Sequence, residues 1–182
     1  MRTSDADILI LPGLNGSGPD HWQSRWEAKL KTARRIEMAN WDRPHLETWV
    51  EKLVAEVHAS TRPVILVAHS LGVLTVAHAA PRLAHHVKGA FLVAPPTESS
   101  IQNIDVIDPA FTPIPDMLFP FPSVLVASRD DTYAAFHESE ALASQWGSAF
   151  TDAGAVGHIN TESGHGPWPE GLMRFAGFLN TI

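Results

Sequence analysis

The 182-residue chain contains no cysteine, which excludes disulfide bonds, thiolate zinc sites and a cysteine nucleophile. It also lacks any apolar run near the roughly 20 residues that a membrane-spanning helix needs, so we expect no membrane partner. The first apolar stretch, residues 8–11, is too short for the apolar region of a secretion signal. We therefore expect a cytoplasmic protein.

Basic residues are scarce as well. The 13 Lys and Arg residues stand against 20 Asp and Glu residues, which gives a formal net charge of -7, and no basic run accompanies the aromatic residues. Proteins that bind nucleic acid neutralise its phosphates with a basic patch. The composition thus predicts no nucleic-acid partner.

Short apolar segments alternate with helical patterns throughout the chain. Apolar residues at helical spacing, with glutamates outside, mark residues 46–57 most clearly as an amphipathic helix. The predicted strands are residues 8–11, 34–39, 63–67, 87–94, 123–128 and 149–153, and the predicted helices are residues 19–31, 46–57, 71–84, 134–146 and 170–180. This alternation indicates a three-layer sandwich with a mostly parallel sheet of about six strands. Right-handed crossovers give the strand order 2-1-3-4-5, with the short sixth strand at the edge.

The length suits one α/β domain, residues 1–182, and leaves no room for a separate cap domain. Residues 95–122 carry seven prolines and little periodicity, so we expect a long irregular segment with at most one short helical turn. Long irregular segments in compact domains tend to form functional lids or walls. Because ligands of such sheets bind at the carboxyl ends of the strands, the loops at that edge are the place to search for a site.

A candidate nucleophile, Ser70, follows a predicted strand and precedes a predicted helix, in the sequence Ala68-His69-Ser70-Leu71-Gly72. In a small-x-Ser-x-Gly elbow, the backbone turns sharply and lifts the serine off the carboxyl edge of the sheet. Ala68 stands where the usual pattern has a first glycine, which is a conservative departure. The alternative interpretation is a serine that only caps the following helix, because serine is a favoured N-cap residue.

A serine nucleophile needs a base to take its proton and an acid to orient that base. The fifth predicted strand is followed by Asp130 and Asp131, and the sixth by His158. Ser, then Asp, then His is the chain order of the α/β-hydrolases, and the separations leave each residue its own strand-end loop. Paired aspartates are also ordinary turn residues, and His165 is the main alternative to His158 as the base.

An oxyanion hole needs two backbone donors, one after the serine and one in the loop after the first strand. These are the amides of Leu71 and Leu14. The glycine-rich loop around Leu14 could also suggest a phosphate cradle, but it lacks the Walker lysine and the Rossmann spacing. His21 and Trp22 follow this loop directly, and we take them as candidate substrate contacts.

These motifs resemble the small α/β-hydrolases of the retinoblastoma-binding-protein-nine family, including its YdeN-type members. The resemblance spans nearly the whole chain and rests on residues 11–13, 18–27, 68–72, 128–131, 157–160 and 166–171. It implies an α/β-hydrolase-like fold and a serine hydrolase acting on esters or small amides, with Ser70 as nucleophile, Asp131 as orienting acid and His158 as base. The Leu-x-Cys-x-Glu motif for retinoblastoma protein does not carry over, because the chain has no cysteine.

Two other classes of function are considered beside the hydrolase. Ten histidines suggest a metal-dependent enzyme, but no His-x-Glu-x-x-His or comparable spacing occurs, so we expect neither a metal nor another cofactor. A non-catalytic binding module on the same fold is the main alternative, because a fold does not determine a function. The expected partner is a small-molecule ester or amide.

Overall fold

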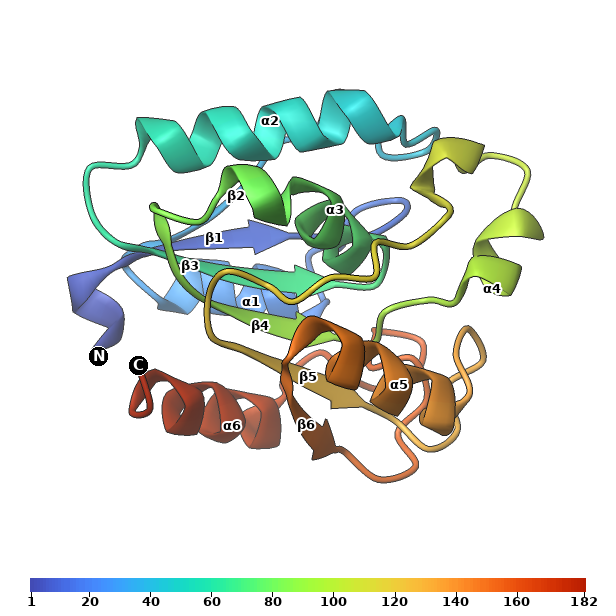
Figure 1. Ribbon diagram of the computed structural model, residues 1–182. Coiled ribbons are helices and arrows are strands. Elements are labelled where there is room, and N and C mark those ends of the chain that lie inside the picture. Colours follow the sequence, from blue (N-terminus) through green and yellow to red (C-terminus); the bar gives the residue numbers. More distant parts are fainter.

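One sheet of six parallel strands forms the centre of the computed structural model, which describes all 182 residues (Figure 1). The strands are β1 (Asp7–Leu11), β2 (Ala33–Arg35), β3 (Val64–His69), β4 (Val87–Val93), β5 (Ser123–Ala127) and β6 (Ala149–Asp152). Their order across the sheet is β2-β1-β3-β4-β5-β6, and each neighbouring pair is parallel. The predicted strand order and the predicted fold class are confirmed.

Helices cover both faces of the sheet (Figure 1). They are α1 (Trp22–Lys29), α2 (Leu46–Ala59), α3 (Leu71–Ala79), α4 (Glu98–Gln102), α5 (Phe136–Trp146) and α6 (Pro169–Leu179), and three short 3-10 turns lie at Thr3–Asp5, Ala80–Arg82 and Pro109–Phe111. The buried apolar side chains of α2, α3 and α5 belong to one cluster, and those of α1 and α6 belong to another. The result is a three-layer sandwich without a separate cap domain.

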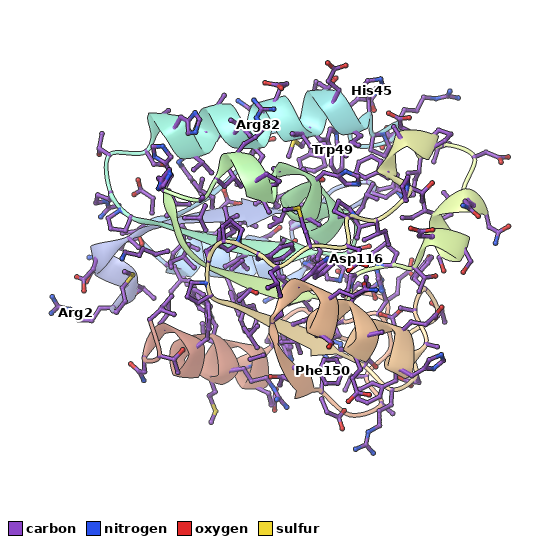
Figure 2. All side chains as sticks on the ribbon, in the orientation of Figure 1. Arg2, His45, Trp49, Arg82, Asp116 and Phe150 are labelled. Atoms are coloured by element: carbon purple, nitrogen blue, oxygen red, sulfur yellow. The ribbon has the colours of Figure 1, made fainter.

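The two clusters meet the sheet from opposite sides. In β1, Leu9 and Leu11 face the cluster under α2, α3 and α5, whereas Ile8 and Ile10 face the cluster under α1 and α6. This alternation follows from the two-residue period of a strand, with both faces covered as parallel sheets require. Trp49 lies on the sheet side of α2 and is 1% exposed (Figure 2).

Several predicted elements are shorter in the structure, among them the helix predicted over residues 19–31, which is α1 (Trp22–Lys29), and for two others the cause is clear. The strand predicted over residues 34–39 already ends at Arg35, because its only neighbour, β1, itself ends at Leu11. The α-helix predicted to continue to residue 84 ends at Ala79, because Pro81 has no amide hydrogen to donate and its ring crowds the preceding turn. None of the helices combines the length and hydropathy needed to cross a membrane.

The proline-rich segment, residues 95–122, contains two short helical turns rather than one, α4 and the 3-10 turn Pro109–Phe111. Figure 1 shows α4 beyond the carboxyl ends of the central strands. Residues 101 and 107 of this segment are buried isoleucines of the cluster under α2 and α3. The segment is therefore anchored to the core beside the strand ends.

Candidate active site

Ser70 is the residue at which strand β3 turns into helix α3. Its φ of 54° and ψ of -126° form a strained backbone conformation. The turn requires Gly72, because a Cβ there would lie 2.5 Å from the carbonyl oxygen of Leu11. The Ser70 hydroxyl makes no capping hydrogen bond to α3, so the interpretation of Ser70 as a mere helix cap is wrong.

The side chains of Ser70, His158 and Asp131, from three different loops, form one hydrogen-bonded chain. Ser70 Oγ lies 2.9 Å from His158 Nε2, and His158 Nδ1 lies 2.9 Å from each carboxylate oxygen of Asp131. A carboxylate only accepts, so Nδ1 carries the proton and Nε2 is free to accept from the hydroxyl. The side chains of His158 and Asp131 are 9% and 3% exposed, which shields this chain from water.

The two neighbouring aspartates have different partners. Asp131 contacts His158 and also accepts from the backbone amide of Tyr133. Asp130 instead accepts from the Gly157 amide and from the Ser128 hydroxyl. These hydrogen bonds, the Gly157 amide first, hold the pKa of Asp130 below its usual value. Asp130 thus links the loop after β5 to the loop that carries the histidine.

Two buried side chains fix the backbone around His158. His69 Nε2 lies 2.9 Å from the carbonyl oxygen of His158, and since a carbonyl only accepts, this nitrogen carries the proton. Burial holds the pKa of His69 well below its usual value, so the ring stays neutral. The indole nitrogen of Trp22 donates to the next carbonyl, that of Ile159, at 2.9 Å.

Trp22 does not contact the cavity, and the expectation of a substrate contact there is wrong. The side chain is fully buried in the cluster under α1 and α6, where it packs edge-on against Trp26 and Trp168. Helical spacing places Trp22 and Trp26 on the same inward face of α1. Its polar contribution is the hydrogen bond to Ile159 described above.

His21 lies in the cavity wall, as expected for a substrate contact. It caps α1 by accepting from the Gln23 amide at Nδ1, over 3.2 Å, which leaves the proton on Nε2. Burial, helped by the positive charge of Arg35, lowers the pKa of His21 to about 4. The ring is therefore an uncharged N–H donor at neutral pH.

The predicted oxyanion donors lie beside Ser70. The Leu14 amide makes no hydrogen bond within the protein, and Leu71 is the first residue of α3, whose amide has no acceptor in its own helix. Gly13 brings the two loops together: a Cβ on it would lie 2.8 Å from Ser70 Cβ and 3.1 Å from the Leu71 nitrogen. Both amides are thus available to an oxygen held near the serine.

A buried amide side chain, Gln23, holds the loop of Leu14. Its nitrogen donates to the carbonyl oxygens of Leu11 at 3.1 Å and Val67 at 3.2 Å, and its oxygen accepts from Ser17 Oγ at 2.7 Å. Arg35 donates to the Ser17 carbonyl at 2.8 Å. No sequence pattern indicates this role of Gln23, because the partners of its nitrogen are backbone carbonyls, which any residue can supply.

A cavity of about 260 Å³ opens at the Ser70 hydroxyl. Its apolar lining comes from Leu14, Leu71, Ile101, Ile104 and Ile107. Polar residues line the rest, among them His21, Asn160 and Glu162. Part of the proline-rich segment therefore forms a wall of the cavity.

His165, the alternative base, does not line this cavity. Its ring is 3.1 Å from the Ser163 hydroxyl and meets Trp168 edge-on. Tyr133, which the sequence analysis did not single out, lines the cavity with its ring centre 4.5 Å from that of His158. No three His, Asp or Glu side chains lie close enough together to hold a metal ion.

Residues 8–177 match a protein family described as serine hydrolase. The chain belongs to this family. Among solved structures, a YdeN-like hydrolase from Pectobacterium atrosepticum is 33% identical to this serine hydrolase, with a TM-score of 0.84 over 97% of this chain and 91% of that one. No curated protein matches this chain.

More distant structures share the fold. The ydeN gene product from B. subtilis is 24% identical, with a TM-score of 0.77 over 96% of this chain and 99% of that one. An α/β hydrolase from the metagenome of Mar Chica lagoon sediments is 15% identical, with a TM-score of 0.72 over 97% and 92%. This member of the serine hydrolase family therefore has the α/β-hydrolase fold.

Proposed function

We propose that this serine hydrolase cleaves a small ester or amide through an acyl-enzyme intermediate on Ser70. The observation that carries the proposal is the hydrogen-bonded chain from Ser70 through His158 to Asp131, with both links at 2.9 Å. This arrangement supplies a nucleophile, a base in reach of its proton and a carboxylate that orients the base.

In the first half of the reaction, His158 Nε2 takes the proton of Ser70 while the serine oxygen attacks the carbonyl carbon. Asp131 keeps the imidazole in the required tautomer and stabilises its charged form without taking the proton. The amides of Leu14 and Leu71 donate to the negatively charged oxygen of the tetrahedral intermediate. The carbonyl re-forms, and the leaving group departs with the proton from His158.

In the second half, water attacks the acyl group on Ser70. His158 takes a proton from that water and then returns it to the serine oxygen as the acid leaves. This half breaks the bond between the acyl group and Ser70 and forms a bond from the acyl group to the water oxygen, while one proton moves from water through His158 to Ser70, so no further group is needed.

Labelling by a fluorophosphonate probe and hydrolysis of p-nitrophenyl acetate test this proposal. The wild-type protein is expected to react in both assays, and the Ser70→Ala variant in neither, with a loss of turnover on the order of a millionfold. A non-catalytic binding module would leave the wild-type protein unlabelled. Wild-type turnover by Ser70→Ala would also overturn the proposal.

A further inference from the structure

We infer that the preferred substrates are esters with a small aliphatic acyl group and a positively charged leaving group. The inference rests on the proposed hydrolysis at Ser70 and adds the chemistry of the two halves of the substrate. It comes from the cavity, whose two sides differ in polarity and in charge.

The position of His158 sets the direction in which the ester lies. The protonated imidazole of His158 donates its proton to the leaving group, so the leaving group must lie next to His158 Nε2. Asn160, Thr161 and Glu162 follow the histidine after one intervening residue, Ile159, and also line the cavity. The leaving group therefore meets the polar side.

The apolar side suits the acyl group. Ile101, Ile104 and Ile107 recur every three residues from α4 onward and line the cavity together. Ile101 and Ile107 are 2% and 6% exposed and belong to the core under α2 and α3, so these side chains cannot easily move outward to enlarge the cavity. On the polar side, by contrast, Ile159 precedes Asn160 in the chain and belongs to the apolar cluster under α1 and α6, on the other face of the sheet.

The size of the cavity limits the acyl chain. Its volume of about 260 Å³ lies below the roughly 300–1,000 Å³ typical of sites for drug-sized ligands. Both halves of the substrate share this space. A short chain that ends against the isoleucines therefore fits better than a long one.

The charge of the cavity favours a cation. Of its 19 lining residues, Glu162 alone carries a formal charge, and neither lysine nor arginine is among them. The Glu162 carboxylate forms no ion pair within the protein. The ring of Tyr133, 38% exposed, adds an aromatic face in the same cavity, which attracts cations as well. An anionic substrate would meet no compensating charge.

Three butyrate esters test the charge preference: butyrylcholine, its uncharged carbon isostere 3,3-dimethylbutyl butyrate, and the anionic 3-carboxypropyl butyrate. We expect kcat/KM for the cationic ester to exceed that for the uncharged isostere by about two- to fivefold, because an ion pair with an exposed carboxylate contributes little free energy. The anionic ester should have the lowest kcat/KM of the three. The ratio of cationic to uncharged ester should shrink between about 0.01 M and about 1 M salt.

Glu162→Gln is expected to lower this ratio toward one, leaving only the contribution of the Tyr133 ring. Glu140→Gln is the matched control, because Glu140 is exposed on α5, lies outside the cavity and changes the net charge equally. The control should keep the wild-type ratio. A wild-type ratio of one or less, or a ratio that Glu162→Gln leaves unchanged, would refute the charge preference.

Choline esters of increasing acyl length test the apolar side. We expect the highest kcat/KM at about four carbons or fewer, with a fall of about tenfold or more once the chain outgrows the cavity. Ile104→Ala should move the optimum to longer chains, because Ile104 is only partly buried and its removal lengthens the cavity. An optimum at long chains in the wild-type protein would contradict the inference.

The same assays distinguish a failure of the proposed hydrolysis at Ser70 from a failure of the proposed substrate preference. If no ester is hydrolysed and Ser70 resists the fluorophosphonate probe, the proposed function fails and this inference fails with it. If Ser70 is labelled and the uncharged ester is hydrolysed without the expected charge or length preference, only the inference on the substrate fails.

Discussion

The hydroxyl of Ser17 donates a hydrogen bond to the side-chain oxygen of Gln23 at 2.7 Å, and the two residues are 5% and 0% exposed. Through its nitrogen, Gln23 also binds the carbonyls of Leu11 and Val67, near the ends of β1 and β3. One side chain thus connects the loop of Leu14 to the strand that leads to the nucleophile. Oxyanion donors act best when the fold holds them in place before the reaction.

Gln23→Leu is therefore expected to lower kcat by about 10- to 100-fold while KM changes much less. Affinity for a boronic acid that mimics the tetrahedral intermediate should fall in parallel. The unfolding free energy should drop by about 1–3 kcal/mol, because buried polar atoms lose their partner. Ser17→Ala removes a single hydrogen bond and should give smaller changes. A destabilised variant with unchanged kcat and boronate affinity would show that Gln23 has a structural role only.

Gly13→Ala is expected to displace the same loop from the nucleophile. The added Cβ would lie 2.8 Å from Ser70 Cβ and 3.1 Å from the Leu71 nitrogen, so the loop must move away from the elbow. We expect kcat for p-nitrophenyl acetate to fall by about tenfold or more. Gly18→Ala is the control, because a Cβ there has open space. Equal activity in the two variants would contradict the prediction.

Much of the fold was predictable from local patterns. Short apolar runs in the sequence predict the buried strands, and right-handed crossovers between these strands give their order in the sheet. The ends of elements were less predictable, because they depend on neighbours: β2 stops where β1 gives it no further partner. The short turns of the proline-rich segment have no periodicity to reveal them.

The candidate site was predictable only in part. Turn chemistry indicated Ser70, and chain order indicated His158, because each residue stands in a strand-end loop. The choice of Asp131 over Asp130 depends on the direction of one side chain, which no spacing encodes. The prediction for Trp22 is wrong because nearness to the glycine-rich loop does not set the direction of a side chain, whereas the helical spacing with Trp26 puts both rings in the core.

Acid should weaken the fold through its buried histidines. Burial lowers the pKa of His21 to about 4 and that of His69 well below its usual value, while the unfolded chain titrates near 6.5. Below about pH 6.5 the unfolded state binds more protons, so the unfolding free energy falls as the pH falls toward about 4. Above this range the two groups add no pH dependence.

For His21 alone, the expected loss between about pH 7 and about pH 5 is about 2 kcal/mol. Urea unfolding at the two pH values measures it. His21→Asn should show a smaller loss than the wild-type protein, whereas His137→Asn, at an exposed position on α5, should match the wild type. Stability that rises on acidification would contradict this account.

Trp22→Phe should affect the loop of the base as well as the core. The variant loses the hydrogen bond to the Ile159 carbonyl and leaves a buried acceptor without its partner, at a cost of about 1–3 kcal/mol. It should also lower kcat, because Ile159 follows His158 directly. Trp26→Phe is the matched control: the indole is buried in the same cluster but donates no hydrogen bond. We expect kcat to fall only in the first variant, and equal effects would refute a role in positioning the base.

The neighbouring aspartates provide the sharpest test of the hydrogen-bonded chain. In Asp131→Asn, an amide group replaces a carboxylate oxygen next to His158 Nδ1, which favours the tautomer with its proton on Nε2, facing Ser70. That tautomer cannot accept the serine proton, so kcat should fall by about 10⁴-fold. In Asp130→Asn, the amide oxygen can still accept from Ser128 and Gly157, and kcat should change by less than about tenfold. Both variants change the net charge equally at adjacent positions, so general electrostatic effects cancel in the comparison. Equal losses in the two variants, measured with p-nitrophenyl acetate, would mean that Asp131 does not orient the base.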